Sequence, residues 1–153
     1  MIISKTPLRI SFFGGGTDYP AWFSKNKGIV IGTTIDKYTY ISCRLLPPFF
    51  NHKHRIIYSK IENVHSINNI KHPSVRECLK YKKIKAGIEI HHDADLPARS
   101  GLGSSSSFTT GLLNCLNKLE NKSITKKKLA KSTIYVEQNL IKENVGSQDQ
   151  IHA

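Results

Sequence analysis

The chain has 153 residues, of which 39% are hydrophobic and 22% are charged, so its composition fits one globular domain and excludes a largely disordered chain. It carries a formal net charge of +12, but its aromatic residues do not interleave with the basic ones, and we therefore expect no nucleic-acid partner. The sequence has no apolar run long enough to span a membrane and no signal-peptide cleavage pattern, so we expect a cytoplasmic protein without a membrane partner.

Taken in chain order, the sequence predicts mostly strands, followed by helices. Runs of β-branched and aromatic residues predict strands over residues 2–13, 29–35, 38–46, 55–60 and 86–92. Apolar residues at helical spacing predict a helix with Ser74 as its N-cap, a second that begins at about Ser105, and a third from Thr125, as its cap, to Ile141. This order is typical of a layered α+β fold.

The segment DLPARSGLGSSSS, residues 95–107, lies between a predicted strand and a predicted helix. Gly and Ser also make linkers, but a flexible linker is not expected between two closely spaced packed elements. A helix N-terminus has unpaired N–H groups and a partial positive charge, which favour phosphate, and Gly101 and Gly103 let the backbone approach an anion closely. The lysine of a Walker A loop is missing. The residues alone leave two alternatives, a phosphate loop and a merely capped helix.

This segment resembles the second motif of the GHMP kinases, a family that includes galactokinase, homoserine kinase, mevalonate kinase and phosphomevalonate kinase. The motif has the form Pro-x-x-x-Gly-Leu-Gly-Ser-Ser and wraps the triphosphate of ATP. The resemblance implies that ATP contacts Pro97, Arg99, Ser100, Gly101, Leu102, Gly103, Ser104, Ser105 and Ser106.

A second segment, TPLRISFFGGGTDY, resembles the first motif of the same family. Two glycines, Gly15 and Gly16, replace the Glu and His that help to hold galactose in galactokinases. The resemblance implies that Arg9 stabilises charge on the transferring phosphoryl group, against the alternative of a surface strand residue. It also implies that the acceptor is bound by Gly15, Gly16, Thr17 and Asp18; an ordinary turn residue is the alternative for Asp18.

A third segment, VEQNLIKENVGSQDQ, resembles the part of these kinases that carries a magnesium-binding glutamate and a catalytic aspartate. Glu137 and Asp149 fall at those positions. We expect Asp149 to lie in a turn after the last helix and to act on the acceptor hydroxyl as a base. Ser105 and Glu137 are the expected magnesium ligands, since magnesium prefers oxygen donors.

The finer resemblance is to bacterial D-glycero-D-manno-heptose 7-phosphate kinases and covers essentially the whole chain. It implies transfer of phosphate from ATP, with Mg²⁺, to the anomeric hydroxyl of a sugar phosphate in the synthesis of activated heptose for surface polysaccharide. It also implies a two-layer, ribosomal-protein-like α/β sandwich. Residues 1–153 are then the N-terminal ATP-binding domain, cut just after Asp149, and a separately encoded C-terminal half is a possible partner.

Three alternatives remain at this point. The first is another GHMP sugar kinase, similar to fucokinase or galactokinase. The second is a non-catalytic ATP-binding fragment, and the third is a basic module that binds polyanions.

Overall fold

The computed structural model describes residues 1–98 and 100–153. Within them the strands are β1 (Ile2–Phe13), β2 (Ile31–Leu45), β3 (His54–Ile57), β4 (Ile61–Val64) and β5 (Ile88–Ala94). The longer helices are α2 (Pro73–Tyr81), α3 (Ser104–Leu119) and α4 (Lys126–Tyr135). The shorter helical segments are α1 (Pro20–Phe23), the 3₁₀ turn η1 (Ile67–Asn69), the π-helical segment η2 (Val136–Ile141) and α5 (Gln148–His152).

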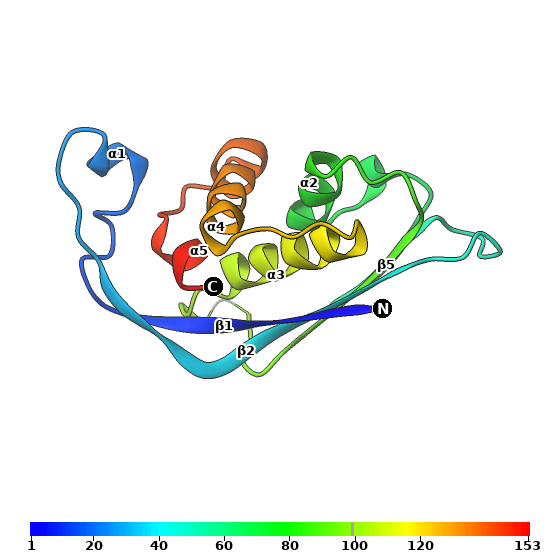
Figure 1. Cartoon of the computed structure of the whole chain (residues 1–153), viewed down its shortest axis with the longest axis horizontal. Helices are drawn as coiled ribbons and strands as arrows, with labels where there is room; N and C mark the ends of the chain where they lie inside the picture. Colours follow the sequence, from blue (N-terminus) through cyan, green and yellow to red (C-terminus); the bar gives the residue numbers. More distant parts are fainter. Residues whose placement is uncertain (99) are drawn as a thin grey trace.

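The strands form one sheet in the order β1-β2-β5-β3-β4, in which only the β3–β5 pair is parallel. Helices α2 to α5 cover one face of this sheet (Figure 1). The hydrophobic core lies between the two layers and joins Ile41 and Ile90 of the sheet to Leu112 and Leu116 of α3. The structure thus confirms the predicted two-layer α+β fold.

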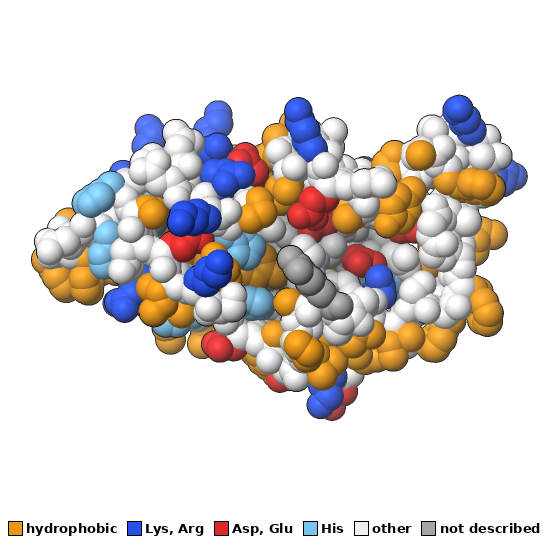
Figure 2. All heavy atoms as spheres, turned by 180° about the vertical axis from the view of Figure 1, so that it is seen from behind, with side chains coloured by type: hydrophobic (Ala, Val, Ile, Leu, Met, Phe, Trp, Pro, Cys, Tyr) orange, Lys and Arg blue, Asp and Glu red, His pale blue; other side chains and the backbone are white. Residues whose placement is uncertain are grey.

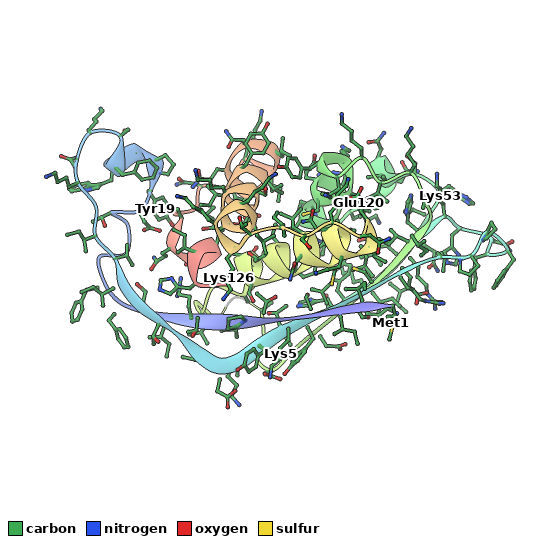
Figure 3. The ribbon with its side chains drawn as sticks, in the orientation of Figure 1. Met1, Lys5, Tyr19, Lys53, Glu120 and Lys126 are labelled. Atoms are coloured by element: carbon green, nitrogen blue, oxygen red, sulfur yellow. The ribbon has the colours of Figure 1, made fainter. Side chains whose placement is uncertain are left out.

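Side chains of β1 alternate between the two faces of the sheet, as the period of a strand requires. Ser4, Thr6 and Leu8 are buried under the helices, whereas Lys5 is exposed and points away from them, with its Nζ 3.8 Å from the centre of the Tyr38 ring (Figure 3). The inner face of β1 is therefore built of small and polar residues as well as Leu8.

These small residues let α3 approach β1 closely at Gly111. A Cβ atom at Gly111 would lie 2.7 Å from Thr6 Oγ1 and 2.9 Å from Ser4 Oγ. One turn earlier in α3, the Ser107 hydroxyl lies 3.1 Å from the carbonyl oxygens of both Thr6 and Pro7, which are its hydrogen-bond acceptors. This packing fixes the N-terminal end of α3 against the middle of β1.

The structure corrects several predicted boundaries. The strands predicted over 29–35 and 38–46 are one continuous strand, because exposed residues 36 and 37 stay extended across the register shift in the pairing of β2 with β1. The strand predicted over 55–60 ends at Ile57, where a tight turn leads into the unpredicted β4.

The helix boundaries also differ in part. Ser74 is not the N-cap of α2, because Pro73 already occupies the first helical turn; His72 is the N-cap, and its ring accepts a hydrogen bond from the Val75 amide. Thr125 caps α4 as predicted: its hydroxyl accepts a hydrogen bond from the backbone amide of Lys128 at 3.3 Å. The helix predicted to run regularly to Ile141 instead widens into η2 after Tyr135.

Gly111→Ala should lower the free energy of unfolding by about 1–3 kcal/mol, although alanine is the better helix former, because its methyl group meets Thr6 and Ser4. Urea unfolding measures the change. The control is Lys118→Ala on the exposed side of the same helix, which should be close to neutral. A Gly111→Ala variant as stable as the parent would contradict the close packing of α3 on β1.

Candidate active site

The glycine-rich loop leads directly into the N-terminus of α3. Gly101 and Gly103 both have left-handed backbones, with φ of +75° and +76°, which non-glycine residues rarely adopt. Gly103 is the N-cap of this 16-residue helix and makes no side-chain cap, so the first amides of α3 depend on other partners. These amides and the helix dipole favour an anion at this position.

The other loop residues predicted to bind ATP lie around this helix end. Pro97 and Ser100 are exposed, Leu102 and Ser104 are half-buried, and Ser105 is exposed at the start of α3. Arg99, which was also predicted to bind ATP, lies outside the described residues. The structure therefore brings the described members of the predicted set together at one helix end.

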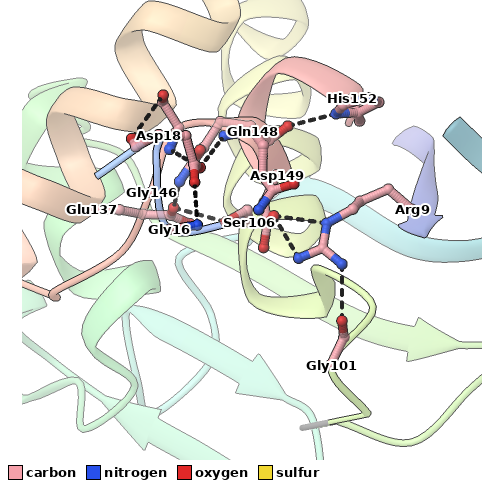
Figure 4. Close-up of polar contacts among 12 residues, drawn as sticks. Arg9, Gly16, Asp18, Gly101, Ser106, Glu137, Gly146, Gln148, Asp149 and His152 are labelled. Atoms are coloured by element: carbon pink, nitrogen blue, oxygen red, sulfur yellow. Dashed lines mark hydrogen bonds and ion pairs between the residues drawn. The ribbon is translucent and has the colours of Figure 1, made fainter. Parts of the chain in front are cut away.

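Arg9 of β1 connects this loop to α5. Its Nε donates to Asp149 Oδ1 at 2.8 Å, and its NH2 group lies 2.7 Å from the same oxygen. Its NH1 group donates to the Gly101 carbonyl at 2.9 Å (Figure 4). The Arg9 backbone amide also donates to the Leu102 carbonyl. Arg9 is thus not a surface strand residue: it holds the loop and Asp149 on either side of one guanidinium group.

Asp149 was predicted to lie in a turn after the last helix. In the structure it lies inside the first turn of the short helix α5. Its side chain keeps 26% of its surface exposed, so the carboxylate is reachable by a ligand. A Cβ atom added to Gly103 would lie 3.3 Å from Asp149 Oδ2 and 3.3 Å from Arg9 Cγ. The glycine-rich loop therefore passes so close to Asp149 that a side chain at residue 103 would require Asp149 or Arg9 to shift.

Glu137 is fully buried, in contrast to the usual solvated position of a carboxylate at the edge of an apolar stripe. Its Oε2 accepts hydrogen bonds from the Ser106 hydroxyl, at 2.8 Å, and from the Gln150 amide. The predicted magnesium pair was Ser105 and Glu137. Among the described residues it is Ser106 that reaches Glu137, because Ser105 points to the exposed side of α3.

The donor set around Glu137 fits a magnesium ion. Burial raises the pKa of Glu137, although hydrogen bonds from Gln150 and Ser106 partly offset this effect. Its Oε1 atom is buried and has no hydrogen-bond partner among the described residues. A buried carboxylate oxygen without a donor is costly unless a cation or proton meets it. Magnesium is usually held by one or two carboxylates together with substrate phosphates, and one carboxylate is available here.

The turn that precedes α1 uses its polar groups internally. The Thr17 hydroxyl donates to the Gly14 carbonyl at 2.7 Å. Asp18 is buried, and its carboxylate accepts hydrogen bonds from three backbone amides. Gly15 lies beside Gln148, and Gly16 has a φ of +97° with open space around it. The turn is thus next to α5, but the polar groups of Thr17 and Asp18 already have partners.

A cavity of about 480 Å³ opens beside the loop. The rings of His72 and Phe108 stack at 4.8 Å, and His92 meets Phe108 edge-on at 4.9 Å. Burial lowers the pKa of both histidines, so their rings are neutral near pH 7. The lining includes His72, Ser74, His92, Leu96, Ala98, Ser104, Ser105, Phe108 and Glu143. An apolar pocket with a few polar groups is typical of a small-molecule site.

Sequence reasoning missed two parts of this site. Gln150 is fully buried against Glu137, and its only signal was its place in the segment GSQDQ. The aromatic cavity gave no signal, because His72, His92 and Phe108 come from three separate elements.

Comparison with known proteins assigns this arrangement to a class. Residues 68–153, more than half of the chain, match the family model of the GHMP kinases N terminal domain. The chain belongs to the GHMP kinase family, as the motifs predicted.

Particular relatives extend this likeness. The chain is 28% identical to a D-glycero-alpha-D-manno-heptose 7-phosphate kinase of Campylobacter jejuni over 99% of its own length and 48% of that protein. Its fold matches a crystal structure described as a D-glycero-D-manno-heptose 1-phosphate kinase from Bacteroides thetaiotaomicron, with a TM-score of 0.84, 20% identity, and coverage of 100% of this chain and 53% of the other. It also matches Lactococcus lactis galactokinase complexed with galactose, with a TM-score of 0.73, 23% identity, and coverage of 98% and 41%. The chain thus spans about half the length of these relatives.

Gly103→Val should abolish binding of magnesium-ATP while the domain stays folded. The new side chain needs a left-handed backbone and meets Arg9 and Asp149. Isothermal titration with ATP measures the loss, and circular dichroism checks the fold. Gly16→Val is the matched control, because it imposes the same strain away from the loop and should keep ATP binding. Unchanged affinity in Gly103→Val would remove this loop from the nucleotide site.

Glu137→Gln should remove a pH-dependent contribution to stability. Because the pKa of Glu137 is raised in the folded chain, the folded state binds its proton more tightly than the unfolded state, and this contribution to stability is lost as pH rises from about 4 through the raised pKa. The Gln variant lacks this loss, so its stability relative to the parent should increase from about pH 4 to about pH 8.

Urea unfolding at the two pH values measures this difference. Mg²⁺ added at the higher pH should stabilise the parent and not Glu137→Gln. The control, Glu77→Gln, changes a partly exposed carboxylate on α2 and should keep the parent's pH and magnesium responses. Equal pH trends in the parent and Glu137→Gln would show that this carboxylate is not the titrating group.

Proposed function

We propose that this chain is the nucleotide-binding half of an ATP-dependent kinase that phosphorylates the anomeric hydroxyl of D-glycero-D-manno-heptose 7-phosphate. The observation that carries the proposal is the contact of Arg9 with both Asp149 and the Gly101 carbonyl, which sets a carboxylate beside a phosphate-binding helix end. The whole-length likeness to the Campylobacter jejuni kinase supports the heptose phosphate as acceptor. The product would feed activated heptose for surface polysaccharide, in the cytoplasm, where ATP is available.

ATP fits the site with its triphosphate on the first amides of α3. The adenine ring of ATP would bind in the neighbouring cavity. There the neutral rings of His72 and His92 and the ring of Phe108 offer stacking surfaces. Ser106 and Glu137 would hold Mg²⁺, which when bound neutralises charge on the phosphates. The buried contact between these two residues keeps them in place without the metal.

Asp149 and Arg9 would act on the acceptor side of the triphosphate. The Asp149 carboxylate accepts the proton of the attacking hydroxyl, and Arg9 orients that carboxylate through its two contacts with Oδ1. The remaining N–H groups of the Arg9 guanidinium are available to phosphoryl oxygens. Gly15 and Gly16 stand where galactokinases have Glu and His, which disfavours galactose and leaves room for a larger acceptor.

An apolar surface beside α5 supports the need for a second half. Four large apolar side chains here are more than half exposed: Phe12 and Phe13 of β1, Ile31 at the start of β2, and Ile29 just before it. Figure 2 shows hydrophobic side chains gathered at this end of the molecule. The relatives are about twice as long as this chain. We propose that a second half, in the same or a separate chain, covers this surface and excludes water from the acceptor.

The test supplies the second half of the Campylobacter jejuni relative to this chain, fused or as a separate polypeptide. With ATP and Mg²⁺, ³¹P NMR should show a new anomeric phosphate on D-glycero-D-manno-heptose 7-phosphate, and little product from galactose, fucose or mevalonate. Asp149→Asn should lower turnover by about a hundredfold or more with ATP affinity nearly unchanged, because the amide keeps the shape and cannot take the proton.

Each part of the proposal has its own contrary outcome. Preference for galactose, fucose or mevalonate would overturn the acceptor and favour another GHMP activity. Near-normal turnover of Asp149→Asn would remove this residue from the chemistry. Ordinary turnover by the 153-residue chain alone would overturn the need for a second half, and failure of this chain to bind ATP would overturn the nucleotide site.

A further inference from the structure

The turn before α1 and the start of α5, which are about 130 residues apart in the sequence, are joined by one carboxylate. Asp18 Oδ2 accepts hydrogen bonds from the backbone amides of Ser147, at 2.8 Å, and Gln148, at 2.9 Å. Its Oδ1 accepts from the amide of Gly16 at 3.1 Å. The Ser147 hydroxyl donates in return to the Asp18 carbonyl at 3.2 Å (Figure 4).

These contacts do for α5 what an N-cap residue usually does for its own helix. The first amides of a helix have no intrahelical acceptors, and a carboxylate near them also interacts favourably with the helix dipole. Ser147 occupies the N-cap position but makes no side-chain capping bond. Asp18 supplies the missing acceptor from the other end of the chain, and only 8% of its surface is exposed.

Gly146 is an independent sign that this contact is built into the chain. A Cβ atom added at Gly146 would overlap the Asp18 carboxylate. Gly146 is not one of the glycines with a positive φ, so its backbone does not need glycine for an unusual turn. Its lack of a side chain instead lets the Asp18 carboxylate approach.

Asp149 follows Gln148 directly, so the position of the α5 N-terminus sets the position of its carboxylate. We propose that Asp18 is a positioning residue: it fixes α5 and thereby aims Asp149, and it does not bind acceptor hydroxyls. This assignment rests on the proposed function for the role of Asp149 and replaces the acceptor-binding role that the sequence predicted for Asp18. Arg9 then holds the same helix from the opposite side, at its first turn.

Hydrogen exchange tests the contact without any activity. In the 153-residue chain, Asp18→Ala should speed exchange of the Ser147 and Gln148 amides by about tenfold, the loss expected for a helix cap. Amides of the inner strand β2, such as Ile41, should keep their rates, which excludes general unfolding. Gly146→Ala, which displaces the carboxylate, should give the same local increase, and the double variant should add little to either. The control Asp36→Asn changes an exposed aspartate and should leave these rates unchanged.

Kinetics in the complete kinase separate positioning from acceptor binding. Asp18→Ala and Gly146→Ala should both lower kcat by about tenfold or more with the KM for the acceptor nearly unchanged, and Asp18→Asn, which keeps one acceptor oxygen, should recover part of the loss. Unchanged exchange, or an effect of Asp18→Ala on acceptor KM alone, would overturn the inference. If Asp149→Asn also keeps normal turnover, the proposed function fails instead, while the exchange result still decides whether Asp18 holds α5.

Discussion

The contact of Arg9 with Asp149 and with the Gly101 carbonyl is the interaction on which the site depends. It joins a strand near the start of the chain to a loop in the middle and a helix near its end. The loop is held near Arg9 by the packing of α3 on β1, where Gly111 faces Ser4 and Thr6 without room for a side chain. A larger residue at this crossing would lift the loop away from the guanidinium group.

A second set of polar contacts ties three helical segments together behind the loop. Ser106 of α3 and Gln150 of α5 both donate to Glu137 of η2. Burying a carboxylate among neutral donors is unfavourable for folding, as the raised pKa of Glu137 shows. Such a cost is typical of a functional position, where a charge is kept for a ligand that meets it.

The π-helical turns of η2 have a direct part in this arrangement. Wide turns of this kind are frequent at functional sites, because they shift one side chain out of the regular helical register. Here they begin at Val136, directly before Glu137, and end where Lys142 takes a left-handed conformation. The side-chain amide of Gln138 donates to the Val145 carbonyl and so holds the loop that follows η2. This loop ends at the start of α5, beside Asp18.

Local sequence signals determined most of the elements: runs of β-branched and aromatic residues predicted β1 and β5, the apolar stripe predicted α3, and Thr125 marked the start of α4. They also placed Gly101 and Gly103 in a loop between a strand and a helix, where the structure has them. Tertiary structure alone decided which serine meets Glu137, that Gln150 belongs to the site, and that Asp18 holds a helix. The first outcome depends on how α3 is rotated about its axis against its neighbours, and the other two depend on contacts between residues far apart in the chain. The spacing of neighbouring residues in the sequence determines neither of these.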